Sequence, residues 1–172
     1  MNSALGGEYA PCPSDTTLGK NAERIRGMRY KHNKVSVYLH FVWTTEDRLP
    51  LITPDIEREL CRCVQEICRT HHCDVRAIGG MPDHVHLLLK MSPTVSMATL
   101  MKEVKGGTSR FVSERLKPGE WFRWRAHYGV FSVTPKDRER IQRYVENQLA
   151  HHANHDLIES AEQSEIETDE PL

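Results

Sequence analysis

Long hydrophobic runs are missing from this chain of 172 residues. No stretch approaches the roughly 20 apolar residues that a membrane-spanning helix needs. The N-terminal segment also contains neither the basic start nor the apolar centre of a secretory signal peptide. With 38% hydrophobic and 27% charged residues, the sequence is typical of a soluble globular protein. We therefore expect one compact domain that works in the cytoplasm.

Cysteine pairs with the spacing of a zinc site or a redox motif are missing as well. The chain has five cysteines, an odd number, and no two of them form a C-x-x-C motif. Without an export signal, this usage indicates a reducing compartment. Four cysteines fall on or just after one expected helix, where we expect buried or half-buried thiols rather than zinc ligands. These four are Cys61, Cys63, Cys68 and Cys73.

A strong net charge is lacking too, since the sum over the chain is -1, but the charges are unevenly distributed. Residues 1–34 are rich in Gly, Pro, Ser and Asn, and we expect a flexible N-terminal arm there. Residues 155–172 contain seven acidic and no basic residues, which predicts an acidic, disordered tail. The domain between them, 35–154, contains 17 basic and 14 acidic residues. A mildly basic domain is compatible with a polyanionic partner.

Hydrophobic periodicity predicts the first half of the domain. Alternating apolar residues from Val35 to Trp43 indicate a strand. Apolar residues at helical spacing follow to about His71, and Thr53 is a candidate N-cap for that helix. Residues 73–90 are expected to form a hairpin whose turn is Gly-Gly-Met-Pro-Asp.

The second half of the domain is predicted to contain two more helices. Residues 92–116 have helical periodicity, and the pair Gly106 and Gly107 suggests a kink or a close approach by another backbone. Residues 119–134 supply one or two short strands, and residues 135–155 form a last helix. The order up to that helix matches a split β-α-β, ferredoxin-like α+β fold with helices on one face of an antiparallel sheet. The last helix is extra, and we expect it to dock at a sheet edge or on a partner.

Two histidines lie in the hydrophobic segment MPDHVHLLLK. His84 and His86 are two residues apart, so they lie on the same face of a strand. The three leucines that follow indicate a buried strand, in which two imidazoles need partners. Core histidines that are simply hydrogen-bonded remain the alternative to a metal site. Asp83 is a candidate for orienting one of the rings, or it is merely a turn residue after Pro82.

The expected last helix offers further candidate ligands. Ile141, Val145 and Leu149 form its apolar stripe, and Tyr144 and Gln148 share a second stripe at the margin. A half-buried packing tyrosine and a solvated amide are the ordinary interpretations of this pair. A polar helix end is the simpler explanation of three further histidines. These are His151, His152 and His155.

The segment GGMPDHVHLLL, followed by GVFSVT and RYVENQ, resembles the single-tyrosine transposases of small bacterial insertion sequences. These enzymes belong to the HUH superfamily of single-strand DNA nucleases, and the resemblance covers nearly all of the expected domain. It implies that His84, His86 and Gln148 bind Mg²⁺ or Mn²⁺ and that Tyr144 is the nucleophile. It also implies metal-dependent cleavage and rejoining of single-stranded DNA through a 5′-phosphotyrosine.

Partners are implied by the same resemblance. Family members bind subterminal DNA hairpins and are homodimers, in which the tyrosine helix can complete the active site of the other subunit. Because two imidazoles suit softer ions than Mg²⁺, we expect Mn²⁺ to support activity at least as well.

Basic and aromatic residues alternate in residues 99–128, which contain seven Lys or Arg and three acidic residues. Trp121, Phe122 and Trp124 lie among them, and such a pattern suits single strands. A solvated helix face with buried aromatic rings is the alternative. The residues predicted to contact DNA are Lys102, Lys105, Arg110, Arg123 and Arg125.

Two other functions remain open at this point. One is a non-cleaving, domesticated relative that binds a DNA or RNA hairpin, and the other is an RNA-binding domain of similar shape. Tyr144 and the two histidines favour the enzyme, because a pure binding protein needs none of them. The RNA-binding domain would need exposed aromatic residues on its central strands, where this sequence has leucines.

Overall fold

The computed structural model describes residues 34–154, apart from the side chain of Leu149. The acidic tail, His155 and nearly all of the expected N-terminal arm lie outside the described residues. The helices and strands follow one another in a β-α-β-β-α-β order with two more helices at the end. They are β1 (Tyr38–Thr44), the short η1 (Glu46–Arg48), α2 (Pro54–Thr70), β2 (Asp74–Met81), β3 (His84–Lys90), α3 (Met97–Phe111), the π-helical turn η2 (Val112–Leu116), β4 (Gly129–Val133), α4 (Arg138–Glu146) and α5 (Gln148–Asn154).

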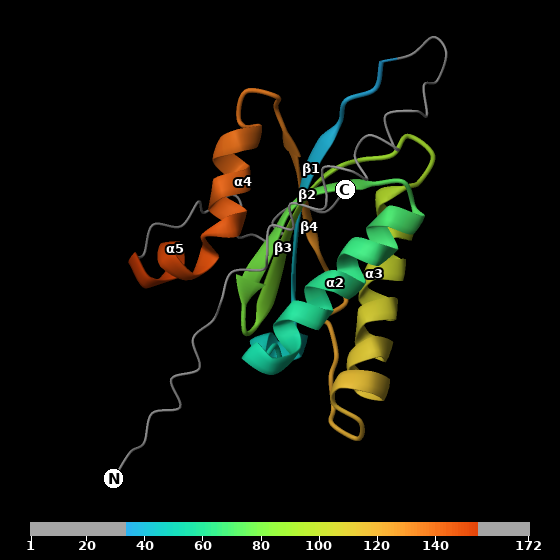
Figure 1. Ribbon diagram of the computed structural model, residues 1–172, viewed down its shortest axis with the longest axis vertical. Coiled ribbons are helices and arrows are strands. Elements are labelled where there is room, and N and C mark those ends of the chain that lie inside the picture. The colour runs from blue at the N-terminus through green and yellow to red at the C-terminus, as the bar shows by residue number, and fades with distance from the viewer. Residues whose placement is uncertain (1–33, 155–172) are drawn as a thin grey trace, which may run out of the picture.

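The four strands form one antiparallel sheet in the order β2-β3-β1-β4. Helices α2 and α3 cover one face of this sheet, and α4 and α5 lie on the other (Figure 1). All seven residues of β1 are buried, because this central strand is covered on both sides. The structure therefore confirms the expected α+β fold, a four-stranded antiparallel sheet with helices, over the residues that it describes.

The main hydrophobic core lies between the sheet and helices α2 and α3. One face of the sheet contributes the alternate residues of β1 and β3 with odd numbers, as the two-residue period of a strand requires. The facing helices contribute residues three or four apart, which form one stripe on each helix. Members of this core include Phe41, Trp43, Leu87, Leu89, Ile56, Leu60, Val64, Leu100, Met101 and Val104.

Helix α4 lies on the opposite face of its own sheet, so the expected docking at a sheet edge is wrong. It forms a second, smaller core in which Ile141 and Val145 pack against Ala77 and Leu88. Gly79 of β2 lies directly under this helix, and a Cβ atom there would overlap the backbone carbonyl oxygen of Val145. Because Gly79 has no side chain, the backbone of α4 can pack directly against β2. The sequence did not reveal this contact.

The ends of two strands also differ from the expectation. Strand β1 begins at Tyr38, and Val35 and Val37 before it are exposed, although the carbonyl oxygen of Val37 still accepts a hydrogen bond from the N–H of Met91. The hairpin turn consists of only Pro82 and Asp83, between β2 and β3. The Gly-Gly pair expected in the turn belongs to β2 instead.

Helix α3 runs through Gly106 and Gly107 without a kink, contrary to the expectation. A Cβ atom at Gly107 would lie 2.7 Å from Cδ1 of Ile67, whereas one at Gly106 would meet nothing within 4 Å. The close neighbour is therefore a side chain of α2, not another backbone.

The single last helix expected over residues 135–155 is divided in two. Asn147 ends α4 with φ -114° and ψ 29°, which are not helical angles, and α5 begins at the next residue. The break falls between Tyr144 and Gln148, so these two residues stand on different helices.

Cys61, Cys68 and Cys73 are buried and Cys63 is half-buried, and all four are thiols, as expected. Between residues 34 and 154, none of the helices has the length and apolar character of a membrane-spanning segment.

Candidate active site

The strand register places His84 and His86 on the face of the sheet that α4 covers. His84 lies opposite Thr44 of β1 and His86 opposite Val42, and residues opposite each other in an antiparallel pair point to the same side. Both histidines are almost fully buried, with 2% and 0% of their surface exposed. Their ring centroids are 5.0 Å apart and the ring planes are 80° apart. The sequence-based prediction that they share one face is therefore confirmed.

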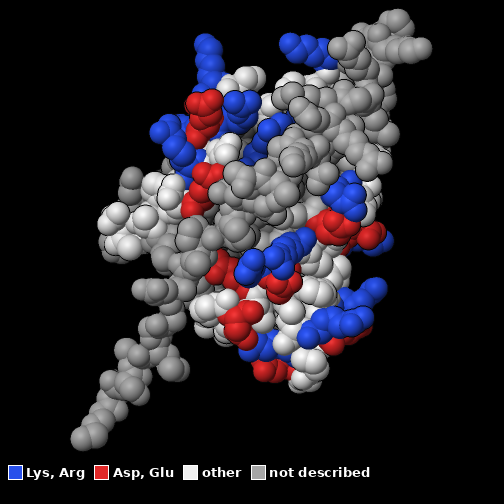
Figure 2. Space-filling model, in the orientation of Figure 1, with Lys and Arg blue, Asp and Glu red and all other residues white. Residues whose placement is uncertain are grey.

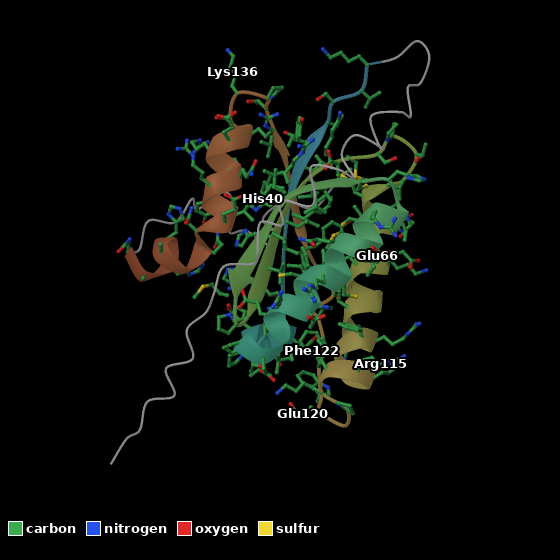
Figure 3. All side chains as sticks on the ribbon, in the orientation of Figure 1. His40, Glu66, Arg115, Glu120, Phe122 and Lys136 are labelled. Atoms are coloured by element: carbon green, nitrogen blue, oxygen red, sulfur yellow. The ribbon has the colours of Figure 1, made fainter. Side chains whose placement is uncertain are left out.

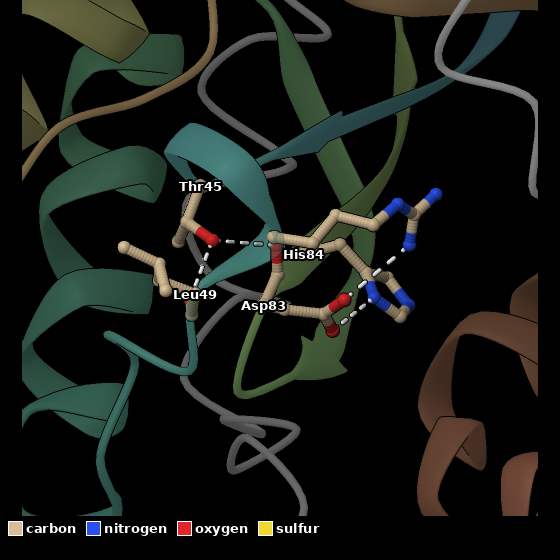
Figure 4. Close-up of polar contacts among 5 residues, drawn as sticks. Thr45, Leu49, Asp83 and His84 are labelled. Carbon is tan, nitrogen blue, oxygen red and sulfur yellow. Dashed lines mark hydrogen bonds and ion pairs between the residues drawn. The ribbon is translucent and has the colours of Figure 1, made fainter.

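Asp83 orients the first ring. Nδ1 of His84 donates a hydrogen bond to Oδ1 of Asp83 at 2.7 Å, and the other carboxylate oxygen pairs with Arg48 at 3.3 Å (Figure 4). Burial alone would raise the pKa of Asp83, but the hydrogen bond from His84 and the charges of His84 and Arg48 lower it overall. Thr45 fixes the turn, because its hydroxyl donates to the carbonyl oxygens of Leu49 and Asp83. Arg48 is a contributor that sequence reasoning missed.

His40 of β1 holds the second ring and was also missed from the sequence. Nε2 of His40 and Nδ1 of His86 share a hydrogen bond of 2.9 Å. The ring planes are only 7° apart and the centroids 5.1 Å apart. His40 is 1% exposed. Its even-numbered position on β1 is the one available signal, since it places the ring on the same face as His86 once the strands are paired.

Tyr144 and Gln148 are buried beside the histidines, each with 2% of its surface exposed. The ring of Tyr144 meets that of His86 edge-on, with centroids 6.0 Å apart and planes 87° apart. The amide nitrogen of Gln148 donates to the backbone carbonyl of Tyr144 at 3.1 Å. The alternative interpretations, a half-exposed tyrosine and a surface amide, are therefore wrong. Docking of α4 on the sheet turns its marginal stripe toward β3.

Two histidines of α5 join this cluster. The ring of His151 lies 4.9 Å from that of Tyr144, and the ring of His152 lies 5.0 Å from that of His84. A polar helix end, which seemed the simpler explanation from the sequence, therefore does not account for their position. The cluster places five histidines and one tyrosine in contact on one face of the sheet.

The cluster contains a donor set that fits a divalent cation. With Nδ1 of His84 bonded to Asp83 and Nδ1 of His86 bonded to His40, Nε2 is the nitrogen that each neutral ring can offer to a cation. Both Nε2 atoms and Oε1 of Gln148 are buried, and Oε1 accepts no hydrogen bond from the described residues.

Two imidazole nitrogens and one amide oxygen suit a divalent transition-metal ion better than Mg²⁺, which prefers oxygen ligands throughout. Residues 34–154 contain no group of three His, Cys, Asp or Glu side chains that could hold a metal ion.

The residues predicted to contact DNA lie mainly around a cavity on the other side of the sheet. The cavity has a volume of about 410 Å³ and lies between α3 and the segment 123–128. Arg110 is exposed on α3 but is not part of the lining. On the face of the molecule shown in Figure 2, Lys and Arg side chains are interspersed with acidic ones. The predicted residues that line the cavity are Lys102, Lys105, Arg123 and Arg125.

Lys105 also ties two segments of the fold together. Its Nζ atom donates to the backbone carbonyl oxygens of Arg125, Ala126 and His127, at 2.5, 2.8 and 3.1 Å. Burial lowers the pKa of Lys105 to about 8. The ammonium group therefore anchors the wall of the cavity to helix α3.

Of the three aromatic residues predicted near the DNA, Trp121 is the exposed one, with 56% of its surface accessible. Phe122 and Trp124 belong to the main core, as the alternative interpretation of the sequence had it. The indole of Trp124 donates to the hydroxyl of Thr108 at 2.9 Å. Phe122 lies beside the α2 and α3 helices, whereas His40 lies at the sheet (Figure 3).

The segment that lines the cavity passes the end of the sheet at which the histidine cluster begins. The backbone N–H of Arg125 donates to the carbonyl oxygen of Thr44 at 3.0 Å, and Thr44 is paired with His84. The basic segment therefore runs past the same end of the sheet as the first histidine, although α3 and α4 cover opposite faces.

Comparisons with known proteins point to one family. Residues 33–148 match the family described as "Transposase IS200 like". ISDra2 transposase TnpA of Deinococcus radiodurans is 30% identical to this chain over 114 residues, which is 63% of this chain and 81% of that protein. The range matched by the family, residues 33–148, spans His84, His86, Tyr144 and Gln148.

Two solved structures are similar in fold. A crystal structure of a proposed transposase from Deinococcus radiodurans R1 superposes with a TM-score of 0.55 at 28% identity, covering 68% of this chain and 94% of that one. A REP-associated tyrosine transposase bound to a REP hairpin also gives 0.55, at 13% identity, with 72% and 73% covered. At that identity the second likeness concerns the fold alone.

Proposed function

The chain belongs to the family of IS200-like transposases, and from that premise we propose that it cleaves and rejoins single-stranded DNA at insertion-sequence ends. The observation that carries the proposal is the edge-on contact between Tyr144 and His86, 6.0 Å between ring centroids, inside a buried histidine cluster. A phenol in contact with an imidazole that lies beside a second imidazole is an arrangement compatible with metal-assisted phosphoryl transfer.

Tyr144 acts as the nucleophile in this proposal. Its phenol oxygen attacks the scissile phosphorus and forms a phosphotyrosine bond to the 5′ side of the break. The bond from phosphorus to the 3′ oxygen breaks, and this oxygen leaves with a proton as a 3′-hydroxyl, while the phenol has lost one. Attack by the 3′-hydroxyl of a second strand reverses the step, so strand transfer needs no ATP. A phenol with a reference pKa near 10 is a weak nucleophile at neutral pH, so its surroundings must assist.

His84, His86 and Gln148 are the proposed ligands of Mg²⁺ or Mn²⁺, which when bound polarises the scissile phosphate and neutralises developing charge. The protein's own contribution is orientation. Asp83 accepts the Nδ1 proton of His84 and so leaves Nε2 of that ring with its lone pair. Since two imidazoles favour softer ions, activity with Mn²⁺ should equal or exceed that with Mg²⁺.

DNA can enter the site only if a segment that buries the histidine cluster moves. Tyr144 and Gln148 are each 2% exposed, so a phosphodiester cannot reach the phenol unless a covering segment moves. The break at Asn147 separates α5 from α4, and the second core holds α4 through Ile141 and Val145. We propose that the part of α5 after Gln148 moves on DNA binding, while α4 stays packed on the sheet and Gln148 keeps its hydrogen bond to the carbonyl oxygen of Tyr144.

Hairpin DNA is the proposed partner of the cavity beside α3. Lys102, Arg123 and Arg125 surround it, and basic side chains neutralise phosphates while an exposed ring such as Trp121 can stack on an unpaired base. The REP-associated transposase of similar fold is bound to a REP hairpin, which supports a hairpin ligand here. From the hairpin, a single strand can pass the Thr44 end of the sheet to reach His84.

A homodimer is the proposed assembly, in line with the family. Within one chain, Tyr144 already contacts His86, so we propose that each active site is assembled from a single subunit in this conformation. If α4 were exchanged between subunits, the same residues would form the active site, but α4 would pack on the sheet of the partner subunit.

The test of the proposed function is formation of a covalent adduct. Labelled single-stranded DNA from either side of the coding sequence is incubated with the full-length protein and Mn²⁺, and then resolved on a denaturing gel. Wild-type protein should give a protein–DNA band, and Tyr144→Phe should give none while still binding a hairpin in a mobility-shift assay. Tyr38→Phe is the matched control, because it removes a tyrosine hydroxyl at the first residue of β1, whereas His84 pairs with the last. It should retain the band. Hairpin binding without any wild-type adduct would instead favour the non-cleaving alternative.

A further inference from the structure

We infer that His40 is a positioning residue that fixes the proton of His86 on Nδ1 and thereby leaves its Nε2 atom with a lone pair. This inference deepens the proposed function and rests on it. His40 lies on central strand β1 at the level of the sheet (Figure 3). Nothing in the catalytic pattern of histidine, hydrophobic residue, histidine and distant tyrosine includes this position.

The geometry couples the two rings. Two imidazole nitrogens 2.9 Å apart, as are Nε2 of His40 and Nδ1 of His86, share one proton, because two lone pairs at that distance repel and two N–H groups clash. Centroids 5.1 Å apart with planes only 7° apart place the rings edge to edge, which suits a direct hydrogen bond. The tautomer of one ring therefore determines that of the other.

Only one of the two coupled tautomer states leaves Nε2 of His86 able to bind a cation. If His86 donates from Nδ1, its Nε2 atom carries the lone pair that a cation requires. His40 must then accept at Nε2 and carry its own proton on Nδ1. In the opposite state the proton of His86 lies on Nε2, and that nitrogen cannot be a ligand. His40 thus does for His86 what the carboxylate of Asp83 does for His84.

The surroundings keep the ring of His40 in place. It is 1% exposed and stands directly opposite Phe131 of β4, with ring centroids 6.1 Å apart. It reaches His86 across the sheet diagonally, since its direct partner on β3 is Leu88. An imidazole held from both sides provides a fixed acceptor, and the ring of His86 cannot turn away without breaking this bond.

The first test needs no variant. Nitrogen NMR of the full-length, metal-free protein, at a pH at which both rings are neutral, distinguishes protonated from unprotonated ring nitrogens. The expected result is His86 protonated on Nδ1 and His40 protonated on Nδ1. A spectrum in which His86 carries its proton on Nε2 would overturn the inference.

The second test compares His40→Leu with His40→Gln. Leucine removes the acceptor and keeps the volume, whereas the amide oxygen of glutamine can accept the proton of His86. Mn²⁺ affinity, measured by electron paramagnetic resonance, should fall by about 10–100-fold in the leucine variant and recover in the glutamine variant. Phe131→Leu is the matched control for a packing change beside His40, and it should keep the wild-type affinity.

The outcomes separate this inference from the proposed function. If wild-type protein forms no covalent adduct, the proposed function fails, yet the tautomers and the Mn²⁺ affinities still test His40. If the adduct forms and folded His40→Leu retains both the wild-type tautomer of His86 and the wild-type affinity, the role of His40 is refuted alone. Should His40→Leu not fold, the tautomer of His86 in the wild-type protein still decides, and a proton on its Nε2 atom would refute the role of His40.

Discussion

Replacement of Gly79 by alanine inserts one methyl group between strand β2 and helix α4. The added Cβ atom would overlap the carbonyl oxygen of Val145, which is backbone and cannot rotate aside. The expected effect therefore comes from lost space, not from backbone conformation. Helix α4 must move away from the sheet, or the strand must yield.

The magnitude follows from what holds α4 in place. Ile141 and Val145 are its buried anchors, and burial of one such side chain contributes about 1.5–3 kcal/mol, so the pair contributes about 3–6 kcal/mol. An extra methyl in a packed interior costs about 1–3 kcal/mol. Because the added methyl group costs less than the two anchors contribute, we expect α4 to shift on the sheet and not to detach. The free energy of unfolding of Gly79→Ala should fall by about 1–3 kcal/mol.

The same shift of α4 should also reduce activity. Tyr144 is the residue next to Val145, so a shift of α4 moves the phenol relative to His86. A misplacement of about 1 Å can reduce a rate roughly 100-fold, and we expect a loss of that order in adduct formation. Hairpin binding should be unchanged, since the cavity beside α3 lies on the other face of the sheet.

The assay is urea denaturation together with hydrogen exchange of the α4 amides. Gly106→Ala is the matched control, because a Cβ atom there meets nothing within 4 Å and alanine stabilises a helix interior by about 1 kcal/mol relative to glycine. Both substitutions replace glycine by alanine, but Gly79→Ala should lower the free energy of unfolding and Gly106→Ala should raise it. If Gly79→Ala unfolds at the wild-type urea concentration and protects α4 equally well, the seating of α4 by Gly79 is refuted.

Three further results are expected. Asp83→Asn should weaken Mn²⁺ binding by about 10–100-fold in a titration, because an amide is a poorer acceptor for a ring N–H, and unchanged affinity would contradict its orienting role. A mixture of Tyr144→Phe and His86→Ala proteins should form no adduct, since both residues act from one chain, and restored activity on mixing would show exchange between subunits. Burial lowers the pKa of Lys105 to about 8, so the unfolded chain binds more protons between about pH 8 and 10.4. The stability of wild-type protein relative to Lys105→Met should therefore rise with pH across that window in urea titrations, and a difference that stays flat or falls with pH would contradict it.

Local periodicity was sufficient to predict the strands, the main helices and the common face of the histidine pair. A two-residue period requires His84 and His86 to lie on one side of β3, whatever the strand pairs with. Likewise, the apolar stripes of α2 and α3 required a sheet face to cover. These features depend on neighbours in the sequence, and the structure confirms them.

Features that depend on distant segments were not accessible. His40 meets His86 only through the register of β1 and β3, and no local pattern marks it as a partner. The burial of Tyr144 and Gln148 follows from the docking of α4, which in turn depends on the missing side chain of Gly79. The burial of Trp124 needs its partner Thr108 on another element.

The account depends on a covalent bond between Tyr144 and DNA. The most direct measurement is peptide mass spectrometry of the protease-digested adduct that forms on labelled single-stranded DNA with Mn²⁺. The account predicts that the nucleotide remnant lies on the peptide containing Tyr144, attached through a 5′-phosphate. A remnant on any other residue, or a 3′-linked one, would contradict it.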